Sequence, residues 1–270
     1  LLRKYISNQH QFHYMHDFFS KLRIFLNSRK VFKNWYIYPN LYYKRNKNVH
    51  AIFETKNNLK IKIRVNSTDL MALTNVWMIN EYEVEKLNIK NNDVIIDVGA
   101  HIGLFSLLVS KFCFSGKIFC FEPNQENFDM LTSNINYNKL ENIIPFNLAV
   151  TKNESEVKLF LDDDQSAHSI FQNGKDAITV KSISLEKIFD RNNIDFCKVL
   201  KLDCEGAEYE IIDSLPKEYF NRIKNIIIEY HYADSKPELV RELISKIKNE
   251  GFQITTRPHY NDMGFLIATR

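Results

Sequence analysis

From residue 93 to the end of the chain, short apolar runs alternate with amphipathic segments. Near-continuous apolar runs of this kind are typical of strands buried on both faces, and the segments between them have helical periodicity. This order predicts a doubly wound α/β fold with a mostly parallel seven-stranded sheet. The predicted strands are 94–98, 117–121, 143–147, 198–203, 225–230, 252–256 and 264–269. The predicted helices are 103–112, 125–138, 184–191, 206–214 and 236–249, the last opened by a Ser235-x-x-Glu238 capping box.

The region before this alternation divides into two parts. Apolar and polar residues alternate in 49–54 and in 59–65, on either side of Asn57-Asn58, which predicts a β-hairpin. A helix is expected after the hairpin, to about residue 79. Residues 1–50 carry 10 Lys/Arg against one acid, a net charge of +9. We therefore predict three segments: a basic, aromatic N-terminal helical cap (1–48), a hairpin and helix (49–92), and a cofactor-binding domain (93–270).

The cap has two interpretations. Apolar residues at helical spacing predict an amphipathic helix over 11–28. Its basic surface could contact an anionic acceptor, and its removal would then spare cofactor binding. Alternatively, its aromatic side chains pack on the main domain while the lysines face water.

Several classes of protein are excluded or disfavoured by composition. No apolar run approaches the about 18 residues of a transmembrane helix, and no signal-peptide segment precedes the basic region. The four cysteines form no CxxC pair, which argues against a zinc knuckle. These features indicate a cytoplasmic protein. The first residue is Leu1, which is consistent with a piece cut from a longer polypeptide.

Two strand ends carry a nucleoside-cofactor signal. Asp97 is followed by a turn with Gly99 and Gly103, and the next strand ends at Glu122, an acid suited to the two hydroxyls of a ribose. A dinucleotide fingerprint would require a third glycine and no acid facing the pyrophosphate. S-adenosylmethionine, a cationic ligand without phosphate, fits better than a nicotinamide dinucleotide.

Four segments in this order resemble the FkbM-type methyltransferases: DVGAHIGLFS, FEPNQENFDMLTSNINYN, NLAV and KLDCEGAEYEII. The resemblance runs from about residue 50 to residue 270 and departs from the pattern at His101, where asparagine is expected. It implies a class I, Rossmann-like O-methyltransferase that uses S-adenosylmethionine. The residues implied to bind the cofactor are Asp97, Gly99, Ala100, His101, Gly103, Glu122, Pro123, Asn124, Ala149 and Val150.

The ends of the fourth and fifth strands supply the candidate catalytic residues Asp203, Glu205 and His231. Methyl transfer to oxygen requires a group that accepts the hydroxyl proton, and each of these side chains can do so. Glu205 could instead stabilise the N-terminus of the next helix. A divalent metal at Asp203, Glu229 and His231 is conceivable but not favoured, so no metal ligands are assigned.

We therefore predict an enzyme that methylates a hydroxyl of a sugar, glycan or other polar small molecule, with an anionic acceptor conceivable. The alternatives are a nicotinamide-dependent oxidoreductase and a non-catalytic nucleoside-binding module. A nucleic-acid substrate is not expected, because the chain lacks the N/D-P-P-Y/F motif of many amino-group methylases. The oligomeric state is not predicted.

Overall fold

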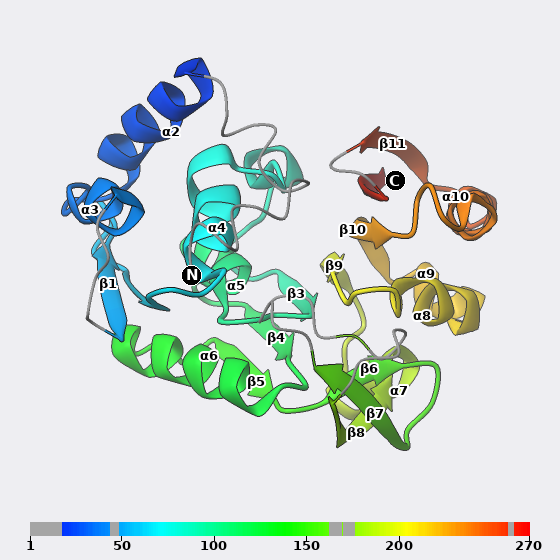
Figure 1. The fold of residues 1–270 in the computed structure, drawn as a ribbon. Coiled ribbons are helices and arrows are strands. Elements are labelled where there is room, and N and C mark those ends of the chain that lie inside the picture. Colours follow the sequence, from blue (N-terminus) through cyan, green and yellow to red (C-terminus); the bar gives the residue numbers. More distant parts are fainter. Residues whose placement is uncertain (1–17, 44–48, 162–168, 170–175, 259–261) are drawn as a thin grey trace.

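A computed structural model describes residues 18–43, 49–161, 169, 176–258 and 262–270. Its centre is a seven-stranded sheet with the strand order β11-β12-β10-β9-β3-β4-β5 (Figure 1). All neighbouring pairs are parallel except those of β12, which runs antiparallel to β10 and β11. The strands are β3 (Val94–Val98), β4 (Lys117–Phe121), β5 (Ile143–Phe146), β9 (Cys197–Leu202), β10 (Ile223–His231), β11 (Gln253–Pro258) and β12 (Met263–Thr269). The predicted seven-stranded, mostly parallel sheet is confirmed.

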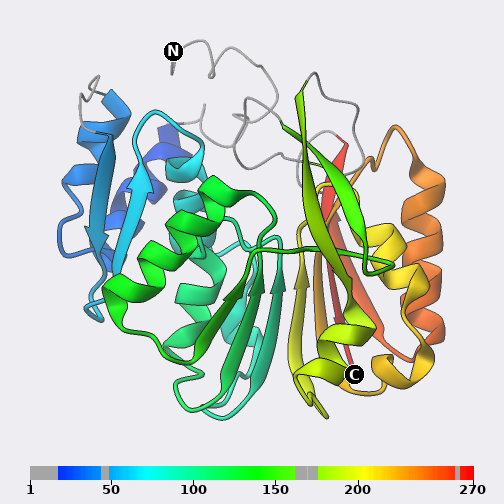
Figure 2. The same ribbon diagram turned by 90° about the horizontal axis from the view of Figure 1, so that it is seen from below.

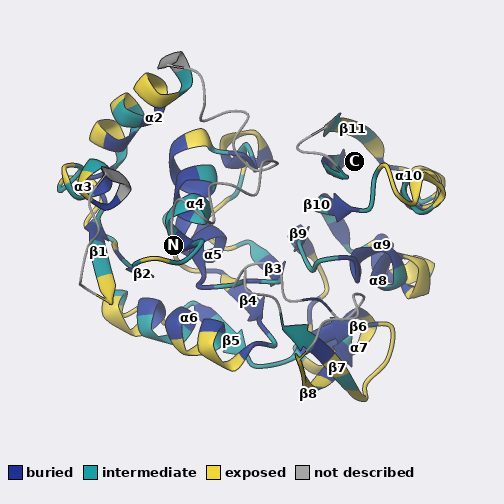
Figure 3. Ribbon diagram, in the orientation of Figure 1, coloured by how far each residue is buried: buried dark blue, intermediate teal, exposed yellow. Residues whose placement is uncertain are grey.

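Helices cover both faces of this sheet, because alternate residues of each strand face opposite layers (Figure 2). Ile95 belongs to the core beneath α5 (Leu104–Ser110) and α6 (Gln125–Asn138), whereas Ile96 belongs to the core on the other face. That second face carries α7 (Leu185–Arg191), α8 (Glu208–Ser214), α9 (Lys217–Phe220) and α10 (Pro237–Asn249). Most residues of the central strands β3, β4, β9 and β10 are buried (Figure 3), whereas Gln253, Thr255 and Thr256 of the edge strand β11 are exposed.

The predicted capping box of α10 is wrong. Lys236 is the N-cap residue and makes no side-chain capping bond, with Pro237 at the first position of the helix. Ser235 instead donates its hydroxyl to Asp262 Oδ2 at 2.8 Å. The contact to Asp262 competes with the local backbone for the serine side chain, which no local pattern reveals.

A second, three-stranded sheet was missed by sequence reasoning. It has the order β6-β8-β7, with β6 (Ala149–Thr151), β7 (Glu156–Leu161) and β8 (Asp176–Ser184). Much of β8 is exposed, so its residues lack the apolar signal of a buried strand. The acidic run 162–164 and His168, which follow β7, lie outside the described residues.

The hairpin is confirmed as β1 (His50–Glu54) and β2 (Lys60–Arg64). The helix before it, α2 (Phe18–Val31), overlaps the predicted helix over 11–28, and residues 11–17 lie outside the described part. A further helix, α3 (Ile37–Tyr43), was not predicted. After the hairpin, α4 (Asp69–Leu73) continues into a π-helical turn, η1 (Thr74–Ile79), and a 3₁₀ turn follows, η2 (Val84–Leu87).

The described part of the cap belongs to the main core. Phe32 is fully buried, pairs through its backbone with Thr55, and its ring lies 5.0 Å from that of Phe53. Tyr38 and Leu41 are buried in the same cluster, which includes Ile95 of the central sheet. These contacts support the interpretation in which the cap's aromatic side chains pack on the domain. None of the described helices is long and apolar enough to span a membrane.

Candidate active site

The strand order reverses direction between β3 and β9, and the turns that follow these two strands touch. In open α/β sheets this reversal is where ligands bind. Gly99 has φ +72°, and a Cβ atom there would lie 1.7 Å from the carbonyl oxygen of Asp203. Within the chain itself, the group that requires a glycine at this position is therefore the backbone of Asp203. Gly103 approaches the side chain of Leu131, 2.5 Å from the corresponding Cβ position.

Asp97 lies beneath this turn and is fully buried. Lys201 Nζ is 3.1 Å from its Oδ1 atom, and Ser106 donates a 2.6 Å hydrogen bond to Oδ2. Lys201 also donates to the carbonyl oxygen of Gly99 at 2.8 Å and lies 3.4 Å from Asp203 Oδ2. Burial lowers the pKa of Lys201, but Asp97 and then Asp203 outweigh it and raise that pKa above its ordinary value. A charged lysine thus joins the ends of β3 and β9. Direct contact between Asp97 and a cofactor stays a prediction.

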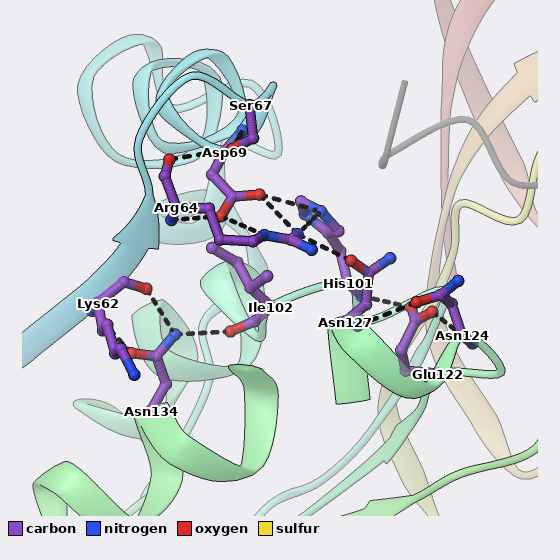
Figure 4. A network of polar contacts seen from close by, with 10 residues as sticks. All are labelled: Lys62, Arg64, Ser67, Asp69, His101, Ile102, Glu122, Asn124, Asn127 and Asn134. Carbon is purple, nitrogen blue, oxygen red and sulfur yellow. Dashed lines mark hydrogen bonds and ion pairs between the residues drawn. The ribbon is translucent and has the colours of Figure 1, made fainter. Parts of the chain in front are cut away.

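Glu122 follows β4 and is 5% exposed. Its carboxylate accepts hydrogen bonds from the backbone N–H groups of His101 at 2.8 Å and Asn124 at 2.9 Å (Figure 4). Burial raises the pKa of Glu122 to about 7, although these hydrogen bonds and that of Asn127 act in the opposite direction. These hydrogen bonds fix the carboxylate beside the glycine turn. In this position it could accept hydrogen bonds from ribose hydroxyls.

The side chain of His101 points away from Glu122, toward the hairpin (Figure 4). Its Nε2 atom lies 3.2 Å from Arg64 Nη2 and 3.4 Å from Asp69 Oδ1. Arg64 also forms an ion pair with Asp69 at 2.8 Å and donates to Asn127 Oδ1 at 2.8 Å. The histidine therefore ties the candidate cofactor turn to β2 and α4, a role that its local sequence does not reveal. His101 also has φ +51°, a conformation that asparagine adopts more readily.

The remaining predicted cofactor residues lie in the turns after β3 and β4 and in β6. Ala100 donates its N–H to the carbonyl oxygen of Phe121. Asn124 caps α6 through its side chain, immediately after Pro123. Ala149 and Val150 are buried in β6, at 3% and 4% exposure. Their contact with a cofactor stays a prediction.

The three predicted catalytic residues meet where β9 and β10 end. Asp203, Glu205 and His231 each provide a ligand atom, and these atoms lie within 4.8 Å of one another. His231 Nε2 is 3.2 Å from Glu205 Oε2, and Nδ1 is 3.1 Å from Oε1 of the buried Glu208. Burial lowers the pKa of His231, but Glu205 and Glu208 outweigh it and raise that pKa well above its ordinary value. The imidazole therefore tends to hold its proton, which makes His231 a poor candidate for the proton acceptor.

Two further acids and a tyrosine adjoin this cluster. Burial, and then the charge of Asp203, raises the pKa of Glu81 to about 8, and the same causes raise the pKa of Glu229 well above its ordinary value. Tyr82 donates a 3.0 Å hydrogen bond to Asp203 Oδ2. Glu81, Tyr82 and Lys201 were not proposed from sequence. No spacing rule connects Glu81 or Tyr82 with Asp203.

Comparison with known proteins identifies the family. A model described as the methyltransferase FkbM domain matches residues 97–254, more than half of the chain. The chain belongs to the FkbM methyltransferase family. Its mostly parallel seven-stranded sheet is that of class I methyltransferases. Membership disfavours the oxidoreductase alternative, because the family transfers methyl groups and implies S-adenosylmethionine as their donor.

Individual relatives of this FkbM protein are distant. The hexuronic acid methyltransferase AglP of Haloferax volcanii is 24% identical over 188 residues, which cover 66% of this chain and 75% of AglP. Methyltransferase sdnD of Sordaria araneosa is 23% identical over 202 residues, covering 62% of this chain and 76% of sdnD. A solved FkbM methyltransferase from Methylobacillus flagellatus has a TM-score of 0.47 at 16% identity and covers 73% of this chain and 53% of its own.

Proposed function

We propose that this protein is an S-adenosylmethionine-dependent O-methyltransferase whose acceptor is a hydroxyl group of a sugar acid or a similar polar small molecule. The observation that carries this proposal is the meeting of Asp203, Glu205 and His231 at the ends of β9 and β10, directly beside the Gly99 turn. The proposed cofactor residues line that turn, so a methyl donor bound there would face the cluster.

The chemistry requires little more than position and a proton acceptor. The sulfonium of S-adenosylmethionine is already an activated methyl donor, so holding the acceptor oxygen in line supplies much of the rate. A carboxylate that accepts the hydroxyl proton adds about 10²–10⁴-fold. We assign this role to Asp203 or Glu205. A sugar acid as acceptor is supported by AglP, whose name specifies a hexuronic acid.

The test is methyl transfer from isotopically labelled S-adenosylmethionine to a panel of hexuronic acids and neutral hexoses, with product masses measured. We expect a labelled methyl ether of a hexuronic acid. Glu205→Gln or Asp203→Asn should lower turnover by about 10²-fold or more, whereas Glu238→Gln, on the exposed start of α10, should not. Label on a carboxyl group or an amine would contradict O-transfer to a hydroxyl. Full activity in both variants would remove the proton-acceptor assignment.

A further inference from the structure

The cluster of Asp203, Glu205 and His231 combines two carboxylates with one imidazole. One ligand atom from each lies within 4.8 Å of the other two, a spacing that a single metal ion can bridge. Asp203 follows β9 and His231 ends β10, so two adjacent parallel strands hold two of the three groups in place. Such a mixed oxygen and nitrogen set suits divalent cations such as Mn²⁺.

The histidine is oriented as metal-binding histidines usually are. Glu208 is fully buried, and its Oε1 atom accepts a 2.9 Å hydrogen bond from the backbone N–H of His231. The same oxygen lies 3.1 Å from Nδ1 of the imidazole. A carboxylate at one ring nitrogen fixes the ring and the tautomer, leaving the other nitrogen for the metal.

That other nitrogen points into the cluster without a hydrogen bond. His231 is 6% exposed, and its Nε2 atom has no hydrogen-bond partner among the described residues. It lies 3.2 Å from Glu205 Oε2 as a charge contact. A buried polar atom in this situation calls for an explanation, and a ligand bound between the two groups supplies one.

The carboxylate of Asp203 is also held, and its surroundings are acidic. Tyr82 and Lys201 both contact Oδ2, at 3.0 and 3.4 Å. Glu81 and Glu229 are further carboxyl groups close enough to interact electrostatically with Asp203. The charges of Asp203 and Glu205 would repel an anionic sugar, whereas a cation bound between them would attract it.

We propose that Asp203, Glu205 and His231 bind one divalent cation of Mn²⁺-like chemistry through two carboxylate oxygens and Nε2. Any proton on Nε2 leaves for solvent when the cation binds. The part of this proposal that rests on the proposed function is the cation's role. It would hold the acceptor's hydroxyl oxygen and favour loss of the hydroxyl proton to the oxygen of Asp203 or Glu205 that does not bind the cation.

Binding is tested on the purified chain without any acceptor. Mn²⁺ is added and the free ion is followed by electron paramagnetic resonance. We expect saturable binding of one Mn²⁺ per chain, weakened by at least about tenfold in His231→Gln, Asp203→Asn and Glu205→Gln, and by about 10–100-fold in Glu208→Gln. Glu238→Gln, at an exposed position, should bind as the wild type does. Circular dichroism and calorimetric titration with S-adenosylhomocysteine establish that each variant is folded.

Saturable binding lost in folded variants of the cluster supports the site. Absence of saturable binding by the wild type, or wild-type affinity in both His231→Gln and Glu205→Gln, overturns it. The two proposals fail separately. Methyl transfer that persists in a chelator with no Mn²⁺ binding would reject the cation and leave the O-methyltransferase assignment standing, whereas Mn²⁺ binding without methyl transfer to any hydroxyl would do the reverse.

Discussion

A Cβ atom on Gly99 would lie 1.7 Å from the carbonyl oxygen of Asp203. The turn after β3 and the end of β9 therefore fit each other through their backbones, and one carries proposed cofactor residues while the other carries proposed catalytic ones. Lys201 reinforces the same junction from below, through the carbonyl of Gly99 and the carboxylate of Asp203. Geometry at this junction determines how a methyl donor could face its acceptor.

Replacement of Gly99 should destabilise the fold through a backbone collision, and a second glycine without that collision serves as its control. Gly99→Ala adds a backbone collision to the strain of a positive φ, and we expect a loss of about 3 kcal/mol or more in the free energy of unfolding. Gly251→Ala is the matched control: its φ is +87°, but nothing lies within 4 Å of its Cβ position. It should lose only about 1 kcal/mol. Urea denaturation measures both, and equal losses would remove the collision from the account.

Lys201→Met should destabilise the fold by about 3–5 kcal/mol, because it leaves the fully buried Asp97 carboxylate without its cation. The double variant Asp97→Asn/Lys201→Met removes the stranded charge and should regain part of this loss. Lys86→Met, at a side chain that is 75% exposed, is the control and should change stability little. Denaturation curves of the wild type, Lys201→Met, Asp97→Asn and the double variant give the coupling energy of the pair. Additive losses would mean that the pair does not interact.

The central sheet could be predicted from the sequence because its strands are buried on both faces. Ile95 and Ile96 face opposite cores, so the whole run is apolar and its pattern is unambiguous. The ends of these strands necessarily share one edge, which is why Asp203, Glu205 and His231 could be proposed together. The exposed strand β8 has no such apolar signal, and it was missed.

Contacts between distant segments could not be predicted. Tyr82 reaches Asp203 across 121 residues of sequence, and Arg64 reaches His101 across 37. No periodicity encodes these distances, since they arise only when the hairpin packs on the sheet. Lys201 lies within an apolar strand, where one charged residue could equally have marked a strand edge.

The stability of the protein should depend on the ionisation of Glu122. Its folded pKa of about 7 exceeds its ordinary value of 4.5, so between these pH values the folded state binds more protons than the unfolded state. This group therefore lowers stability as pH rises from 4.5 to 7, by about 3 kcal/mol at most. Glu122→Gln should flatten that part of the profile, and Glu126→Gln, on the exposed first turn of α6, should not. An unchanged slope in Glu122→Gln would show that its pKa is not raised.

The cap should be required for folding. Phe32 is fully buried against Phe53, so Phe32→Ala should lower the free energy of unfolding by about 3–5 kcal/mol. Deletion of residues 1–48 removes this and other core side chains and should yield an unfolded or insoluble protein. The exposed Tyr36 provides the control, because Tyr36→Ala should cost much less. A truncated protein that folds and binds cofactor would restore the interpretation of the cap as a separable acceptor-binding arm.

The central claim is that the turns after β3 and β4 bind S-adenosylmethionine. Calorimetric titration with S-adenosylhomocysteine, its demethylated product, tests this claim most directly. We predict one site per chain for S-adenosylhomocysteine and none for NAD. Glu122→Ala should weaken the affinity by about 1.5–3 kcal/mol through lost hydrogen bonds to a charged acceptor, while Glu126→Gln should leave it unchanged. Absence of binding by the folded wild-type protein, binding of NAD in its place, or wild-type affinity in Glu122→Ala would contradict the account.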